Sequence, residues 1–301
     1  MKLATTTWDF EKYLDVYGSI KAIKDAGFRY VDLNLKGTEP YLSPDCANWQ
    51  DEVKKIGAYA ESIGVKLVQA HSPNANCMKE GRLEKEIFQA KRSIEICQLL
   101  GIRDVVVHAG YRENVSKDEW ATYNADFYRA LIPTMEQTGV YVLHENTTSK
   151  NLPTGWFYGY TGKDIVDFLE YVDHPLLQAV WDTGHGITEG SQYENITAIG
   201  KHLRALHVHD NSGRADEHAL PYTGILNLDD LLNALIAIDY KGYFTFEAGQ
   251  ILQPSNGRNK RQRFAADARL LDPTLEMQEA AERLLYVIGK SALSAYGLFE
   301  E

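Results

Sequence analysis

Imidazole and carboxylate side chains are concentrated in residues 204–218 of the chain. A short apolar run there carries His207 and His209 into Asp210, and a glycine-containing turn then leads to Asp216 and His218. Imidazole nitrogens together with carboxylate oxygens, and without a thiolate, suit Zn²⁺, Mn²⁺, Fe²⁺, Co²⁺ or Ni²⁺ better than Ca²⁺. We therefore interpret this stretch as one half of a metal site.

The same residue types recur where other predicted strands end. These ends, or the turns that follow them, carry His71, His108, Glu145, Asp182, His185 and Glu247. Of the nine histidines, only His174 and His202 lie away from strand ends. Three carboxylates brought to one point would repel each other by on the order of several kcal/mol, and a divalent cation would remove that repulsion. The ends of several strands are therefore predicted to supply the other half of the site.

Strand alternation distinguishes neighbouring side chains at these ends. Successive residues of a strand point to opposite faces, and residues two apart share a face. If Glu145 points into the mouth of a barrel, His144 points outward and is expected to pack against the helices. His207 and His209 share a face, so one of them can bind a metal while the other lines the pocket above it.

Eight units, each a strand followed by a helix, are predicted to fill the chain. The strands are expected at residues 3–7, 30–34, 65–71, 104–108, 140–145, 177–182, 205–209 and 243–247. The helices are expected at about residues 13–26, 53–63, 83–100, 116–138, 165–172, 196–203, 228–238 and 275–293. Near-continuous apolar strands between amphipathic helices are typical of a parallel sheet covered by helices.

This pattern predicts an α/β fold, a single (β/α)8 TIM barrel over residues 1–301, with a C-terminal helical extension from about residue 270. An open, doubly wound sheet is the second interpretation, but no GxGxxG motif follows the first strand. In a barrel the active site lies at the C-terminal ends of the strands, which is where the histidines and acids gather. The apolar side chains of the last helix, Leu284, Leu285, Val287 and Ile288, are expected to cap the barrel, with contact to a second copy in a homo-oligomer as the alternative.

The charge of the chain limits its partners. The formal net charge is −11, so the overall field opposes binding to nucleic acid. One basic patch is present, and it consists of Arg258, Lys260, Arg261 and Arg263. We interpret this patch as a solvated loop, with a phosphate-binding role as the alternative. A small molecule is therefore the expected substrate.

Cysteine usage and hydropathy point to the cytoplasm. The three cysteines, Cys46, Cys77 and Cys97, lie far apart and form no CxxC pair, which fits a reducing compartment. No apolar run approaches the ~20 residues that span a bilayer. The first residues read as a strand rather than as a signal peptide. We expect a cytoplasmic protein without a membrane partner.

Five short motifs resemble one known superfamily. They are Val-Leu-His-Glu-Asn at 142–146, Trp-Asp-Thr-Gly-His at 181–185, Leu-His-Val-His-Asp-Asn at 206–211, Ala-Asp-Glu-His at 215–218 and Phe-Glu at 246–247. With these motifs in this order, the sequence resembles the xylose isomerase-like barrel superfamily, which includes sugar isomerases and epimerases as well as endonuclease IV. The motifs cover the C-terminal two thirds of the chain, and His71 and His108 extend the resemblance toward the N-terminus.

The ketose 3-epimerase branch implies one divalent metal per chain, Mn, Zn, Co or Mg, held by Glu145, Asp182, His207 and Glu247. It implies a metal-dependent isomerase or epimerase, of the intramolecular oxidoreductase or racemase/epimerase class, that acts on a sugar, sugar phosphate or related polyol or keto compound. Proton transfer would pass through a metal-stabilised enediolate. Glu145 and Glu247, facing each other across the mouth, are the candidate acid/base pair.

Substrate contacts are expected beside this pair. The resemblance implies that His185 and a nearby arginine, Arg214, hold substrate oxygens. The aromatic loop with Trp156, Phe157, Tyr158 and Tyr160 is interpreted as an apolar wall that excludes water, with buried packing of the loop as the alternative.

The endonuclease IV branch implies three zinc ions and the cleavage of abasic-site DNA. Each of its nine metal ligands has a counterpart in the chain. Four are the ligands named for the epimerase branch, and the other five are His71, His108, His185, Asp216 and His218. The net charge and the scarcity of basic residues at strand ends favour the isomerase or epimerase. A non-catalytic sugar-binding barrel is the third hypothesis, and the intact set of carboxylates argues against it.

Overall fold

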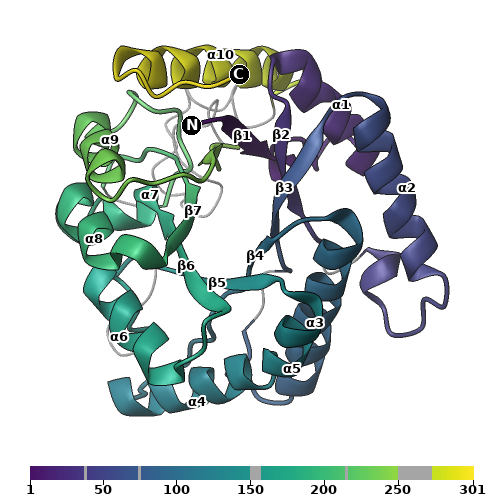
Figure 1. Cartoon of the computed structure of the whole chain (residues 1–301), viewed down its shortest axis with the longest axis vertical. Helices are drawn as coiled ribbons and strands as arrows, with labels where there is room; N and C mark the ends of the chain where they lie inside the picture. Colours follow the sequence, from purple (N-terminus) through teal and green to yellow (C-terminus); the bar gives the residue numbers. More distant parts are fainter. Residues whose placement is uncertain (37–38, 74–75, 150–156, 214–215, 250–272) are drawn as a thin grey trace.

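The protein is a parallel barrel of eight strands surrounded by helices (Figure 1). The computed structural model describes residues 1–36, 39–73, 76–149, 157–213, 216–249 and 273–301. Within these residues the strands are β1 (Leu3–Thr6), β2 (Tyr30–Asn34), β3 (Lys66–His71), β4 (Asp104–Val106), β5 (Tyr141–Glu145), β6 (Leu177–Asp182), β7 (Leu203–His207) and β8 (Phe244–Phe246). They are joined in the order β7-β6-β5-β4-β3-β2-β1-β8.

The barrel closes between β7 and β8. Val208 forms a parallel bridge with Phe246. The Val208 amide donates to the Thr245 carbonyl at 2.8 Å, and the Glu247 amide donates to the Val208 carbonyl at 3.1 Å. The predicted barrel is confirmed, and the open doubly wound sheet is wrong.

Helices surround the strands, and all of them except the four-residue α7, which packs against β6 and β7, form the outer layer (Figure 1). They are α1 (Val16–Ala26), α2 (Trp49–Ser62), α3 (Leu83–Leu100), α4 (Lys117–Arg129), α5 (Ile132–Thr138), α6 (Gly162–Val172), α7 (Thr183–Gly186), α8 (Gln192–Ile199), α9 (Leu228–Ala237) and α10 (Leu275–Ala295). In the described residues, three short 3-10 helices lie in connections between a strand and a helix: η1 (Thr7–Phe10), η2 (Pro40–Leu42) and η3 (Gly200–His202).

Local sequence explains where several helices begin and end. Ser116 and Glu119 form the predicted capping box at the start of α4. The continuous helix predicted for residues 116–138 is wrong, because α4 ends at Arg129 and α5 begins at Ile132. Pro133 lies in the first turn of α5, and a proline nitrogen cannot donate the hydrogen bond that would continue α4.

The inside of the barrel has an apolar layer beneath the mouth. Val106, Leu143, Val180 and Ala205 are buried together, with Tyr141 packed against them. Each of Leu143, Val180 and Ala205 precedes an acidic or histidine side chain by two residues in its strand, so these side chains share the inward face. The larger apolar cluster lies between the strands and the helices. The polar side chains of the mouth therefore lie directly above a layer of packed apolar side chains.

Helix α10 follows β8 in the chain and lies between α9 and α1 (Figure 1). Tyr286 packs edge-on against Phe28 at a ring distance of 5.1 Å. Leu285 is fully buried, whereas Leu284 and Val287 are exposed. Among the described residues, none of the helices has the length and apolar character needed to cross a bilayer.

Candidate metal centre

Four predicted metal ligands meet at the C-terminal mouth of the barrel. Each offers one ligand atom, and these atoms lie within 4.8 Å of one another: Glu145, Asp182, His207 and Glu247. His207 Nδ1 lies 2.7 Å from Glu145 Oε1 and 3.4 Å from Glu247 Oε2. The parallel register brings the ends of these neighbouring strands to the same height in the barrel, since Asp182 of β6 pairs with His207 of β7. The two glutamates that were expected to face each other across the mouth thus approach the same imidazole nitrogen.

The second oxygen of Glu145 faces two further histidines. Glu145 Oε2 lies 3.8 Å from His71 Nε2 and 3.5 Å from His108 Nδ1. The rings of His71 and His108 are 4.7 Å apart. One ligand atom each of His71, Glu145 and His207 also lie within 4.8 Å of one another. Glu145 therefore belongs to two overlapping groups of candidate ligands.

A third group lies beside Asp182 and is formed by His185, His209, Asp216 and His218. His218 Nε2 lies 3.0 Å from Asp216 Oδ1, and His185 Nε2 lies 3.6 Å from Asp216 Oδ2. His209 Nε2 lies 3.0 Å from Asp182 Oδ2, and its ring stacks on His218 at 4.0 Å. His209 shares a strand face with His207 and lies above it. Because His209 contacts both Asp182 and His218, it links the first group of candidate ligands to the third.

His218 is held in an unusual backbone conformation. Its φ of 46° is in the left-handed region, which costs energy for a residue other than glycine. The ring is fixed by contacts on two sides, because Nδ1 lies 2.8 Å from the Glu247 carbonyl oxygen and Trp8 packs edge-on at 5.0 Å. These contacts hold Nε2 toward Asp216.

Charge interactions at the mouth are strong because the groups are buried. Burial alone would raise the pKa of Glu145, but the imidazoles of His207 and His108 hold that pKa well below its usual range. Burial lowers the pKa of His108 to about 4, so its ring is neutral near pH 7 and free to act as a ligand. Burial opposes the charge on His218, yet the Asp216 carboxylate raises the pKa of His218 to about 9.

Two buried residues beneath the site were not predicted. Asp32 in β2 and Gln69 in β3 contact the side of His207 that faces away from the carboxylates. The sequence did contain a signal for them. Asp32 is a charged residue between Val31 and Leu33 in an apolar strand, and Gln69 lies two residues before His71 and therefore shares its inward face.

His144 points away from the mouth, as its alternation with Glu145 predicted. Its ring is fully buried and lies 4.8 Å from the ring of Phe168 and 6.2 Å from that of Trp120. Its Nδ1 lies 3.1 Å from the Tyr128 hydroxyl. His144 is therefore part of the packing between β5 and the helices.

Two predicted substrate contacts, Arg214 and Trp156, lie outside the described residues, as does the basic patch at residues 258–263. Of the aromatic loop, Phe157 is buried and packs on Trp120 at 5.0 Å. The Tyr158 hydroxyl donates to the Val115 carbonyl at 2.6 Å. Phe157 is therefore packed against α4, and Tyr158 is half-buried.

The residues of the first group fit a divalent cation. Three carboxylates converge on one imidazole, and Glu145 Oε2 is buried without a hydrogen-bond partner. A buried carboxylate oxygen without a partner costs free energy on the order of 1–3 kcal/mol, which a bound cation would offset. The donor set of nitrogen and oxygen suits Mn²⁺, Zn²⁺ or Co²⁺.

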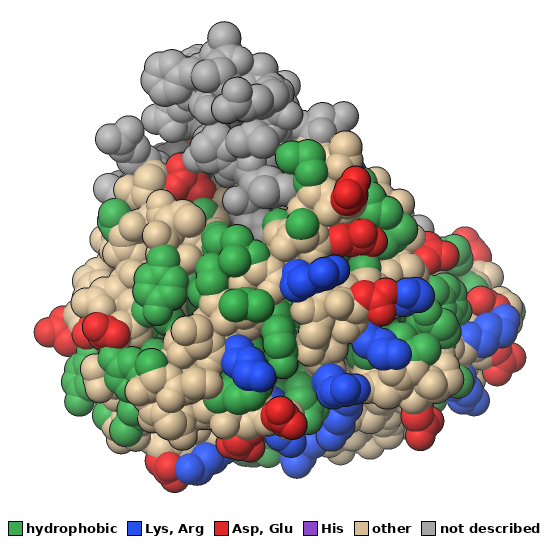
Figure 2. Space-filling model, turned by 90° about the horizontal axis from the view of Figure 1, so that it is seen from above, with side chains coloured by type: hydrophobic (Ala, Val, Ile, Leu, Met, Phe, Trp, Pro, Cys, Tyr) green, Lys and Arg blue, Asp and Glu red, His purple; other side chains and the backbone are tan. Residues whose placement is uncertain are grey.

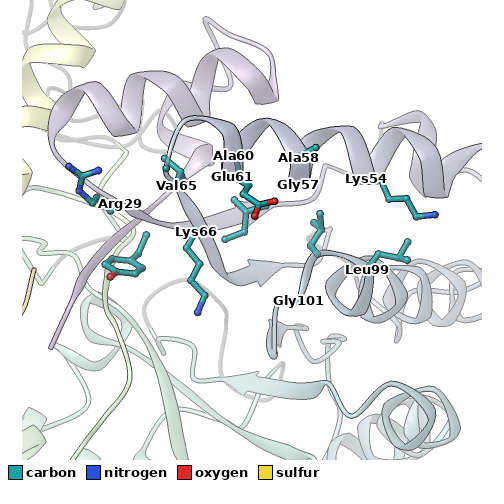
Figure 3. A pocket seen from close by; sticks show the side chains of 14 residues that line it. Arg29, Lys54, Gly57, Ala58, Ala60, Glu61, Val65, Lys66, Leu99 and Gly101 are labelled. Carbon is teal, nitrogen blue, oxygen red and sulfur yellow. The ribbon is translucent and has the colours of Figure 1, made fainter.

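A cavity of about 760 Å³ lies at the opposite end of the barrel, where β2 and β3 begin. Arg29, Lys54, Glu61 and Lys66 line it, together with apolar side chains from α2 and α3. Figure 3 shows the three basic side chains pointing in different directions rather than toward one point. None of the predicted site residues lines this cavity, so it is separate from the candidate metal centre.

The chain belongs to the xylose isomerase-like TIM barrel family, whose model matches residues 20–273. It is similar to the uncharacterized protein MJ1311 of Methanocaldococcus jannaschii, with 25% identity over 243 residues that cover 76% of this chain and 78% of that protein.

Among solved structures it resembles D-psicose 3-epimerase from Clostridium cellulolyticum H10, with a TM-score of 0.75 and 17% identity over 97% of this chain and 99% of that one. It also resembles the 3-keto-D-glucoside 4-epimerase YcjR from E. coli, with a TM-score of 0.69 and 19% identity over 95% of this chain and 99% of that one. At these identities the two structures establish the shared fold.

Proposed function

We propose that the protein is a divalent-metal-dependent isomerase or epimerase that moves a proton next to the carbonyl of a sugar, a sugar phosphate or a related polyol or keto compound. The observation that carries the proposal is the convergence of Glu145, Asp182, His207 and Glu247 within 4.8 Å at the mouth of the barrel. The names of the similar structures, a psicose 3-epimerase and a keto-glucoside 4-epimerase, support a sugar as the substrate class.

The four residues would hold the cation, and Glu145 and Glu247 would also transfer the proton. A bound divalent cation would polarise the substrate carbonyl and so acidify the neighbouring C–H. One glutamate carboxylate removes the proton from that carbon, and the other returns a proton to the opposite face or to the adjacent carbon. The Glu145 side chain is 1% exposed and that of Glu247 is 15% exposed, so bulk water reaches the first carboxylate less than the second.

Substrate oxygens would be held beside the metal ligands. His185 follows Asp182 in α7, and its Nδ1 lies 2.9 Å from the Asn146 carbonyl oxygen, which orients the ring. Its Nε2 then faces Asp216 and the mouth. We propose His185 as a substrate contact, and Arg214 and Trp156 remain predicted contacts of the same kind.

A trinuclear zinc phosphodiesterase is the second candidate function. The specific observation in its favour is that two further ligand groups surround the first, one with His71 and one with His185, His209, Asp216 and His218. The net charge of −11 argues against a DNA substrate. Figure 2 shows one face of the molecule, on which the Lys and Arg side chains of the described residues are mixed with Asp and Glu rather than joined in a stripe.

The number of bound metal ions and two activity assays distinguish the two candidate functions. Chelator-treated protein is reloaded separately with Mn²⁺, Zn²⁺, Co²⁺ or Mg²⁺, and bound metal is measured by elemental analysis. Free and phosphorylated ketoses are then incubated in D₂O, and abasic-site DNA is offered in parallel. One metal per chain with deuterium incorporated next to the carbonyl is the expected result. Three zinc ions per chain with DNA cleavage would establish the second candidate, and no stoichiometric metal would overturn both.

A further inference from the structure

Helix α10 has apolar side chains on two faces. Its inner face packs against the barrel, and Leu285 and Leu293 on this face are fully buried. On its outer face Met277, Leu284 and Val287 are 38%, 49% and 55% exposed. A helix that covers a core carries polar or charged side chains on its opposite face. The outer face of α10 therefore has more apolar surface than the contact with the barrel requires.

The exposed apolar side chains follow one stripe along α10. Met277 and Leu284 are seven residues apart, and so are Ala280 and Val287, which lie three residues further along the helix. This is the spacing of a helix that packs lengthwise against another helix. Ser291 continues the stripe with a small exposed side chain, so the stripe extends over about four turns. A second helix can therefore lie along it.

Charged side chains form a row beside the stripe. Glu276, Arg283 and Lys290 are exposed and seven residues apart, so they lie on one side of the helix. The row begins with an acid and ends with a base. Within the described residues Lys290 lies over the ring of Phe299 at 5.2 Å and is not paired with a carboxylate. The row is thus complementary to a copy of itself that runs in the opposite direction.

Antiparallel packing of two α10 helices matches both the stripe and the row. With a twofold axis near Arg283, Glu276 of each copy lies beside Lys290 of the other, and Met277 lies across from Val287. The two Arg283 side chains near the axis are long enough to turn toward solvent. A parallel pair would bring Glu276 beside Glu276 and Lys290 beside Lys290. A second copy in the antiparallel direction is therefore the occupant that the charges favour.

We propose that the protein is a homodimer in which the outer faces of two α10 helices pack antiparallel across a twofold axis. Figure 2 looks onto the side of the molecule on which α10 lies, and apolar side chains are exposed there among acidic and basic ones. The inner face of α10 covers the barrel of its own chain, and the outer face meets the second copy. This inference goes beyond the proposed function and uses none of the candidate metal ligands.

Sedimentation equilibrium of the full-length protein over a range of concentrations tests the interface. We expect the wild type to be a dimer, and Leu284→Glu or Val287→Glu to raise the dimer dissociation constant at least about 30-fold. Tyr193→Glu is the matched control, because Tyr193 is 41% exposed on α8 and lies outside the stripe. This control should dimerise as wild type does. Circular dichroism verifies that each variant is folded.

Charge reversal tests the antiparallel direction. Glu276→Lys places lysines together at both ends of the interface, and we expect the dissociation constant to rise about 3–10-fold. In the double variant Glu276→Lys with Lys290→Glu, the row is reversed but is again complementary to itself. The dissociation constant of this double variant should return close to the wild-type value.

Three results would overturn the inference. The first is a wild type that stays monomeric at every concentration. The second is a dimer that folded Leu284→Glu and Val287→Glu variants leave intact, because the contact would then lie elsewhere. The third is a double charge variant that dimerises no better than Glu276→Lys, because the two helices would then not run antiparallel.

Discussion

The two ends of the barrel neutralise buried charge in different ways. At the N-terminal end, where the strands begin, Asp104 of β4 pairs with Arg204 of β7, and the guanidinium lies 3.6 Å from the ring centroid of Tyr141. At the C-terminal mouth, Glu145 and Glu247 face His207 and Asp182 faces His209, so the charged partners of these carboxylates are imidazoles. At their other ends, β4 and β7 lead to His108 and His207, which face the Glu145 carboxylate.

A third acidic site, made by Glu282 of α10 and Asp9 of η1, is neutralised by a proton, because burial raises the pKa of both carboxyls. Glu282 is fully buried beside Asp9, and burial raises the pKa of Glu282 to about 7. Interactions with Asp9 and Thr5 only partly oppose this effect of burial on the pKa. Arginine, a proton and, in our proposal, a divalent cation therefore balance three buried acidic sites of one fold. The comparison teaches that carboxylates balanced by imidazoles, rather than by an arginine or a proton, offer the donor set that suits an external cation.

The largest effect is expected from the two glutamates of the mouth. Glu145→Gln or Glu247→Gln removes a carboxylate that can carry a proton, so proton exchange at the substrate carbon should fall about 10²–10⁴-fold. Deuterium incorporation measured by NMR checks this. Glu61→Gln, an exposed position on α2, is the control and should keep full exchange. Wild-type exchange in both mouth variants would show that other groups move the proton.

Removing the metal should lower the free energy of unfolding through the mouth of the barrel and leave the contribution of the other end unchanged. A cation present at a hundred times its dissociation constant should raise the free energy of unfolding by about 2.7 kcal/mol, because it binds only the folded mouth. Denaturant titration with and without Mn²⁺ measures this. Asp104→Asn should retain the stabilisation, and Glu247→Gln should lose it. Equal stabilisation of these two variants would place the cation elsewhere.

The ion pair at the other end should matter for stability alone. Asp104→Asn leaves the Arg204 guanidinium without its charged partner and should lower the free energy of unfolding by about 2 kcal/mol. Metal affinity in the same variant should equal that of wild type. A changed affinity would mean that the two ends are coupled through β4 or β7.

The smallest effect concerns the protonated carboxyl of Glu282. Its pKa of about 7 in the folded protein lies above the ordinary value of 4.5, so the unfolded chain releases this proton first. The free energy of unfolding should therefore decrease as pH rises through this window, by about 1 kcal/mol between pH 6 and pH 7. Glu282→Gln should flatten that slope in urea titrations at the two pH values. An unchanged slope would assign the pH dependence to another group.

Much of the fold follows from local pattern. Apolar strands that alternate with amphipathic helices are short-range features, and the limits of β2, α3 and β6 agree with those predicted. The candidate ligands were also predictable, because parallel strands of one barrel must end at the same mouth. The break between α4 and α5 was missed although Pro133 is visible in the sequence, since the apolar spacing on both sides suggested one helix.

Tertiary structure alone decided how the side chains are shared among the three groups. The sequence determined that Glu145, Asp182, His207 and Glu247 lie at strand ends, because residue type and alternation are local properties. It did not determine that His207 turns Nδ1 to the acids and Nε2 to Asp32, or that His209 reaches Asp182. Those contacts join residues far apart in the chain, and they depend on strand register and on closure of the barrel between Val208 and Phe246.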